Sequence, residues 1–414
     1  MRKRTGDWRD LLSAYALALD AKKIYVGFIA TVFTVVIAMV AALAYRGLNH
    51  LGLLSAPSRS LLQLGNDAGT SILWHFGEGT GMDVVSAFLV LLNPFYGNLA
   101  HFILSVLVYV ALFWAWSGTG GVVARLAALE YARDDMPTLQ EARAMVNARR
   151  RAYFLAPLMP LVVIVFLSAL NMIGGLIASG WYIGRILLIF PGFPLLVAST
   201  AIIVFLIVFG ILSFGLMMPA VSVGGKDAFE SWSTAYSYVL WGPRRFISYS
   251  VLAGVLGAIA VVVAWGLTEF LIYALCRTVN MGYISSMPWI HYDASAAGGR
   301  VAISILPWGG GLWSVLSAIV VALLIVVRAL PVAYAFAYFF TAGTVIFFLM
   351  RKDQDNIEVE ELYEEAAEEE EEIGEGAKEP APEEKEPSAD EKGQLEAGDA
   401  AKEGPQAEGD EEQP

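Results

Sequence analysis

The sequence predicts an all-α integral membrane protein: a polytopic bundle of about six transmembrane helices followed by a disordered acidic C-terminal tail. Of the 414 residues 57 % are hydrophobic, and long apolar runs recur along the first 350; about 18 apolar residues suffice to cross a bilayer. Residues 351–414 carry 26 acidic and 6 basic side chains, whereas residues 1–350 carry 14 acidic and 21 basic ones. The composition therefore divides the chain at Arg351 and excludes a soluble enzyme with an ordinary charged surface.

Three segments follow from this division. Residues 1–23 are predicted to form a cytoplasmic interfacial amphipathic helix, residues 24–350 a transmembrane helical domain, and residues 351–414 a tail too polar to offset its ordering entropy. One face of the first helix is apolar and consists of Trp8, Leu11, Leu12, Tyr15 and Leu19. Such a face suits a helix that lies on the inner leaflet; a plain helical extension of the first span is the alternative.

Five apolar runs predict membrane-spanning helices: Ile24–Tyr45, Leu99–Gly118, Phe154–Ile177, Leu195–Met218 and Phe246–Leu275. A sixth region, Leu312–Met350, is nearly twice as long as one span needs, and it contains Pro331, a residue type that starts or kinks helices. We expect Pro331–Met350 to be the sixth span, with Leu312–Ala329 a packed outer or re-entrant helix leading into it. Seven spans with a tight turn at Arg328–Pro331 are the alternative.

The distribution of lysine and arginine sets the predicted orientation. Six such residues precede the first span, six lie between the second and third, three lie between the fourth and fifth, and Arg351 and Lys352 follow the sixth. The opposite loops hold one or two each. The alternation is complete with six spans and both termini in the cytoplasm, whereas a seventh span would put the tail outside.

Spans two–three and four–five resemble each other as helical hairpins. In each pair, a short cytoplasmic helix is predicted to start at Thr138 or Asp227, and Glu141 or Glu230 follows three residues later. This spacing is typical of a capping box, in which both side chains bond to backbone N–H groups at the helix start. Chance similarity between two amphipathic loops is the alternative.

The segment Pro219–Tyr238 and the following Arg244-Arg245-Phe246 resemble uncharacterised bacterial six-helix inner-membrane proteins. They are also similar to the membrane domain attached to some glycerophosphodiester phosphodiesterases, in which a span ends at a proline and a short capped helix leads into the next span. The resemblance implies the architecture and a bacterial plasma-membrane location. The hydrolase's soluble domain has no counterpart in this sequence, so lipid hydrolysis is not expected.

Few polar residues fall within the predicted spans, where charged groups often mark a transport path. Glu269 and Arg328 are expected to form an intramembrane ion pair that clamps the fifth and sixth spans; the alternative is that Glu269 titrates in an outward-facing cavity. Asn171 predicts a hydrogen bond between helices, and small residues such as Gly27 and Gly257 predict close helix packing. No residue set has the spacing of a catalytic, cofactor-binding or metal-ligating site, so no cofactor and no enzymatic activity are expected.

Five arginines next to predicted spans are candidate contacts for anionic lipid headgroups: Arg149, Arg150, Arg151, Arg244 and Arg245. Each cation at a membrane surface gains on the order of 1 kcal/mol from anionic lipid, although the orientation rule alone also explains them. The acidic tail is a candidate competitor for these arginines and a candidate contact for a cytoplasmic protein partner. Nucleic acid is not an expected partner of so acidic a chain.

Two functions are compatible with these features. The leading hypothesis is a non-enzymatic membrane scaffold or adaptor that presents its acidic tail to cytoplasmic partners. The alternative is a small transporter or lipid-handling protein with a cavity between the two repeated hairpins. Scarce intramembrane charge favours the first hypothesis, and a cavity-facing Glu269 would favour the second.

Overall fold

A computed structural model describes residues 8–54, 88–95, 97–133, 136–180, 182–281 and 312–355. Within these ranges every regular element is helical, and six helices are long and apolar enough to cross a membrane. The main helices of these six candidate spans are α2 (Ala21–His50), α5 (Leu99–Arg133), α7 (Arg150–Gly180), α9 (Phe193–Gly224), α11 (Pro243–Met281) and α12 (Leu312–Asp355). The protein is therefore an all-α, multi-pass membrane protein, as predicted. The predicted tail lies almost entirely outside the described residues.

Short helices connect or precede the spans. They are a 3₁₀ turn (Trp8–Asp10), α1 (Leu11–Leu17), α6 (Leu139–Ala148), α8 (Tyr182–Leu187), a π-helical turn (Leu188–Gly192) and α10 (Ala228–Trp241). Contacts bring α1, α6 and α10 to the same end of the spans, which we call the basic end. There the Lys22 ammonium donates to the Pro137 carbonyl at 2.9 Å, and the Tyr131 hydroxyl donates to Asp10 Oδ2 at 2.9 Å.

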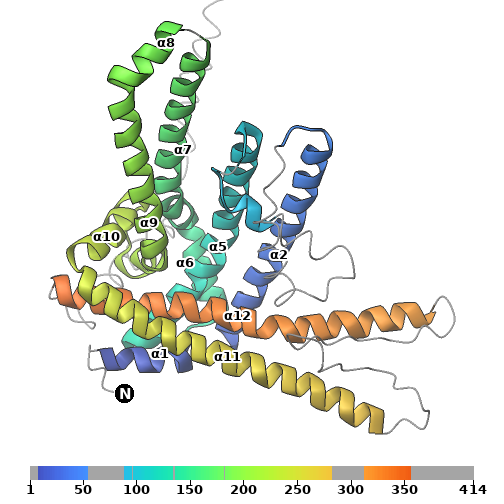
Figure 1. Ribbon diagram of the computed structural model, residues 1–414. Coiled ribbons are helices and arrows are strands. Elements are labelled where there is room, and N and C mark those ends of the chain that lie inside the picture. Colours follow the sequence, from blue (N-terminus) through green and yellow to red (C-terminus); the bar gives the residue numbers. More distant parts are fainter. Residues whose placement is uncertain are drawn as a thin grey trace, which may run out of the picture. The chain divides into compact units, whose positions relative to one another are not determined.

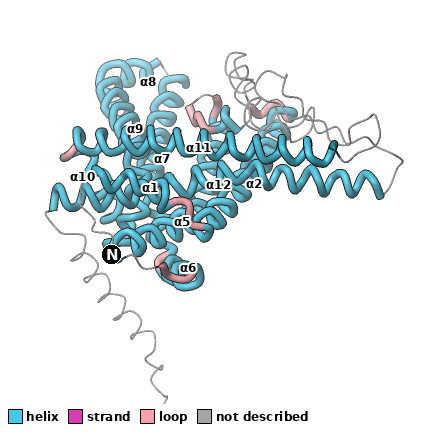
Figure 2. The backbone as a smooth tube through the Cα atoms, turned by 90° about the horizontal axis from the view of Figure 1, so that it is seen from below, coloured by secondary structure: helices cyan, strands magenta, loops and turns pink. Residues whose placement is uncertain are grey.

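Helix α12 is the central packing element. It contacts α2, α5, α9 and α11, and its second half is largely buried. Figures 1 and 2 show α11 and α12 side by side. Close approach depends on small residues: Gly27 of α2 lies against the backbone of Ala333, and Gly257 of α11 lies against the Tyr338 ring. The predicted packing role of both glycines is confirmed.

The structure corrects the prediction for residues 312–350. Leu312–Ala329 and Pro331–Met350 are not separate elements, because α12 runs without a break through Pro331. Proline in a helix interior removes one N–H donor, a loss that a long helix packed against several neighbours can tolerate. The turn at Arg328–Pro331 does not form, and six candidate spans remain. The helix also extends past Arg351 to Asp355, so the predicted start of the tail lies within α12.

The apolar face predicted near the N-terminus is divided between two environments. Leu11 is buried, with Ala14 and Leu17, because α1 packs against α11 and α12. Trp8, Leu12, Tyr15 and Leu19 are exposed. The first spanning helix begins at Ala21, so Lys22 and Lys23 belong to it rather than to the preceding segment.

Candidate functional site

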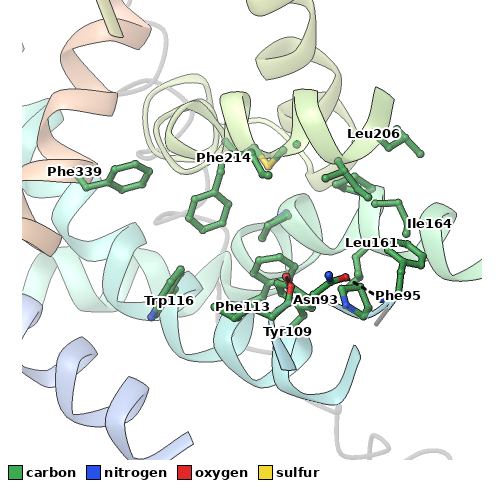
Figure 3. Close-up of a pocket in the computed structure, with 18 residues that line it drawn as sticks. Asn93, Phe95, Tyr109, Phe113, Trp116, Leu161, Ile164, Leu206, Phe214 and Phe339 are labelled. Atoms are coloured by element: carbon green, nitrogen blue, oxygen red, sulfur yellow. Dashed lines mark hydrogen bonds between the residues drawn. The ribbon is translucent and has the colours of Figure 1, made fainter. Parts of the chain in front are cut away.

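An apolar cavity of about 580 Å³ lies between α5, α7 and α9 (Figure 3). Helix α7 contributes Pro157, Pro160, Leu161 and Ile164 to its wall, and α9 contributes residues such as Leu206, Ile207 and Phe214. Residues 92–95, which precede α5, and Phe339 of α12 complete the lining. Phe95 and Ile211 on the lining are strongly exposed, so the cavity is open to its surroundings.

Aromatic rings form one wall of this cavity. Tyr109, Phe113 and Trp116 recur at helical spacing on one face of α5. Phe214 of α9 packs against them, with its ring centroid 5.9 Å from that of Phe113 and 6.0 Å from that of Trp116. Figure 3 shows Phe214 between this wall and Phe339, whose ring centroid is 6.1 Å away. Packed rings in these geometries give the wall a fixed shape.

The opposite wall contains two buried prolines, Pro157 and Pro160. Neither has an N–H group, so the carbonyls of Tyr153 and Ala156, four residues earlier, lack their usual intrahelical donors. Two prolines inside one apolar span were a sequence signal, not used in the prediction, that two backbone carbonyls of α7 lose their usual donors.

The polar side chains of the lining already have protein partners. The Tyr109 hydroxyl donates to the Leu92 carbonyl at 2.6 Å, and Trp116 Nε1 donates to Thr34 Oγ1 at 2.9 Å. Asn93 Oδ1 accepts the Phe95 N–H at 3.2 Å. An occupant of the cavity therefore meets mainly carbon atoms, and recognition rests on apolar contact rather than on hydrogen bonds.

The cavity does not lie between the two predicted hairpins as whole units. Helix α9 packs against α5 and α7, while α11 packs against α12, α1 and α10. Only the first helix of the second hairpin therefore shares the cavity with the first hairpin. The capping analogy also holds at one helix only: Thr138 and Glu141 form a capping box, but Asp227 makes no side-chain cap bond. Glu230 instead pairs with Lys226 at 2.9 Å, so the second capping box was a wrong prediction.

The structure brings Glu269 and Arg328 together, with Arg328 Nη2 2.9 Å from Glu269 Oε2. Both side chains are mostly buried at the contact of α11 and α12, and neither lies on the cavity lining. The Ser199 hydroxyl of α9 donates to Asn171 Oδ1 of α7 at 2.7 Å, which confirms the predicted bond between helices.

The five candidate headgroup arginines lie on separate elements. Arg149, Arg150 and Arg151 lie at the junction of α6 and α7, and Arg150 is placed over the Trp114 ring at 5.0 Å. Arg244 is exposed at the start of α11, while Arg245 pairs with Asp353 of α12 at 2.9 Å.

A buried polar layer at the basic end was missed by the sequence interpretation. Lys23 of α2 is fully buried, forms an ion pair with Glu130 of α5 and donates to the Leu17 carbonyl at 2.8 Å. Arg125 of α5 donates to the Ser222 carbonyl of α9 at 2.8 Å. The sequence prediction placed Lys23 and Arg125 outside the spans, because it ended each span where its apolar run ends. Helices α2 and α5 extend beyond those runs and include both residues.

A second polar cluster, which we call the α12 clasp, holds the end of α12. The Tyr238 hydroxyl donates to Asp355 Oδ2 at 2.6 Å, the Tyr249 hydroxyl donates to Asp353 Oδ2 at 3.0 Å, and Arg245 pairs with Asp353. Burial, reinforced by the Asp355 carboxylate, raises the pKa of Tyr238 well above its ordinary value. The base of the acidic segment is therefore fixed on α10 and α11.

No protein-family model, curated protein or solved structure matches this chain. Among the residues that the structure describes, no group of three or more His, Cys, Asp or Glu side chains is placed to hold a metal ion. The apolar cavity between α5, α7 and α9 has the size of a ligand site, since such sites usually measure about 300–1,000 Å³.

Proposed function

We propose that this chain is a non-enzymatic lipid-binding membrane protein that holds an acyl chain of a membrane lipid in the cavity between α5, α7 and α9. The observation that carries the proposal is an open cavity of about 580 Å³ with a nearly all-carbon lining inside the membrane-spanning part of the chain. This conclusion favours the lipid-handling alternative over the scaffold hypothesis.

The surroundings of the cavity support an acyl chain as its occupant. Spanning helices are surrounded by lipid tails, so the molecules available at the cavity mouth are hydrocarbon chains. The Tyr109 hydroxyl and the Trp116 N–H already donate to protein acceptors, and Asn93 Oδ1 accepts a backbone N–H. A polar solute that enters this mainly apolar cavity would give up hydrogen bonds to water that the lining does not fully replace. Glu269 lies outside the lining, and none of the described lining residues carries a charge that could help to move an ion.

Filling the cavity tests the proposal. Ile207→Trp and Leu161→Trp each place a large ring at a lining position. Val208→Trp and Val162→Trp are matched controls, because these adjacent residues are exposed and off the lining. Each protein is purified from native membranes in mild detergent, and bound lipid is counted by native mass spectrometry.

We expect the wild type and both controls to retain lipid that the two filled variants lack. If a filled variant does not fold, Ile211→Trp at the exposed mouth of the cavity replaces it. Equal lipid retention by folded filled variants and controls would overturn the proposal.

We also propose that the basic end faces the cytoplasm of a bacterial cell and that the membrane is its plasma membrane. The excess of lysine and arginine in the segments that join the spans at this end supports the orientation. The accessibility of a single introduced cysteine to a membrane-impermeant reagent tests it. Modification of a cysteine at exposed Arg151 in intact cells would contradict the orientation.

The scaffold hypothesis is the second candidate function, and the α12 clasp supports it. The clasp fixes Asp353 and Asp355 on α10 and α11, so the end of α12 is anchored. The test compares affinity purification of the full chain with that of a chain ending at Asp355, which keeps the clasp. A discrete protein partner lost with residues 356–414 would support an adaptor role, and identical partners for both forms would refute it.

A further inference from the structure

A second, smaller cavity of about 220 Å³ lies at the basic end, between α2, α5 and α6. Its apolar floor comes from the spanning helices and includes Val26, Phe33 and Ala115. Its rim carries Arg143 and Asn147 of α6 and Arg150 at the start of α7. We call this cavity the arginine groove; it shares no lining residue with the larger cavity.

Aromatic rings position both guanidinium groups of the groove. Arg150 lies over the Trp114 ring at 5.0 Å, and Arg143 lies over the Tyr25 ring at 5.9 Å. A guanidinium over a ring face keeps N–H donors at its edge for another acceptor. In the ranges that the structure describes, neither arginine has a carboxylate within ion-pair distance, and both side chains are exposed.

We propose that the arginine groove binds one anionic glycerophospholipid, with its phosphate between Arg143 and Arg150 and an acyl chain along the apolar floor. Guanidinium donors match phosphate oxygens geometrically. The floor belongs to helices that cross the membrane, so the groove joins a headgroup-binding rim to a surface for hydrocarbon. This combination fits a lipid rather than a free anion, and it is independent of the function proposed for the larger cavity.

The groove can be tested by its charge and by its shape. The charge variant is Arg143→Gln/Arg150→Gln. Its matched control is Arg9→Gln/Arg133→Gln, which removes the same charge from exposed arginines off the groove. The shape variant is Gly118→Leu, since a Cβ on this lining glycine meets no atom within 4 Å. Gly254→Leu is its control, because Gly254 is equally unobstructed but lies on α11 away from the groove.

The measurement is native mass spectrometry of protein released from nanodiscs of equimolar phosphatidylglycerol and phosphatidylcholine. All variants also carry Ile207→Trp, which closes the larger cavity, so that the two sites are counted separately. We expect selective phosphatidylglycerol retention to fall about 30-fold in the charge variant, as expected for two interfacial cations. It should fall in Gly118→Leu as well and stay unchanged in both controls.

Two results would overturn the proposal. Equal loss in the two charge variants would show a diffuse attraction of the basic surface for anionic lipid. Displacement of phosphatidylglycerol by inorganic phosphate, with Gly118→Leu behaving like the wild type, would show a simple anion site that does not use the apolar floor.

Discussion

Gly343 of α12 lies directly against the backbone carbonyl of Gly215 on α9. A Cβ on Gly343 would lie 3.1 Å from the Gly215 carbonyl carbon and still closer to its oxygen. Four residues beyond Gly215, Pro219 has no N–H to donate to that oxygen. Because Pro219 donates no hydrogen bond to it, the Gly215 carbonyl of α9 is left without its usual intrahelical donor. Helix α12 approaches this carbonyl closely enough at Gly343 for a Cα–H···O contact.

Gly343→Ala should destabilise the protein by about 1–3 kcal/mol, because overpacking forces α9 and α12 apart. The measurement is thermal unfolding in detergent. Gly254→Ala, at a position where a Cβ meets no atom within 4 Å, should change the midpoint little. Equal midpoints for the two variants would contradict the close packing of α9 on α12.

Glu130→Gln should destabilise the protein by about 3 kcal/mol, because it leaves the fully buried Lys23 ammonium without its counter-charge. Lys23→Met/Glu130→Gln should recover most of that loss, since the uncompensated charge is removed. Unfolding free energies of the two variants and the wild type measure the effect. If Glu130→Gln alone is as stable as the wild type, the Lys23–Glu130 pair does not hold α2 on α5.

The α12 clasp should weaken at alkaline pH. Burial raises the pKa of Tyr238 in the folded protein, whereas an unfolded tyrosine titrates near pH 10. The folded state therefore binds more protons in that range, so this contribution to stability is complete below about pH 10 and decreases as the pH rises further. Tyr238→Phe should show a shallower alkaline decrease in unfolding temperature than the wild type. Parallel pH profiles would rule out this role of Tyr238.

Glu269→Gln should lower stability by on the order of 1 kcal/mol and leave lipid retention unchanged, because the pair with Arg328 joins α11 and α12 and lies off the cavity lining. The swapped variant Glu269→Arg/Arg328→Glu should restore part of the loss. Unfolding measurements and lipid counts on the same samples check both expectations. Loss of lipid at unchanged stability would instead favour a functional cavity beside Glu269.

The spans were predictable because their apolar runs are long and are separated by polar or basic segments. Helix ends were not predictable from the same signal. The run Leu99–Gly118 marks only the first part of α5, which continues to Arg133, since backbone hydrogen bonding does not stop where the hydrocarbon layer ends. The break expected at Pro331 did not form because burial of the second half of α12 among its neighbours offsets one missing hydrogen bond.

The apolar cavity between α5, α7 and α9 could not be derived from the sequence. Phe113, Ile164 and Phe214 have the composition of ordinary core residues, and only the spacing of three helices leaves a space between them. The Glu269–Arg328 pair was accessible to prediction, because two isolated opposite charges at similar depth in apolar segments need each other. The arginine groove was partly accessible: Arg150 was a candidate contact, but Arg143 lies in a helix whose docking on α5 only the structure shows.

The most direct test of lipid binding is photo-crosslinking in native-like bilayers with a phospholipid that carries a diazirine in its acyl chain, followed by mapping of the labelled peptides. We expect labelling to concentrate on the cavity lining, at Leu161, Ile164 and Ile207, and to decrease there when unlabelled lipid is added. Labelling spread evenly over exposed faces such as Phe166, Leu170 and Val208, with no enrichment on the lining, would contradict the proposal that the cavity holds a lipid chain.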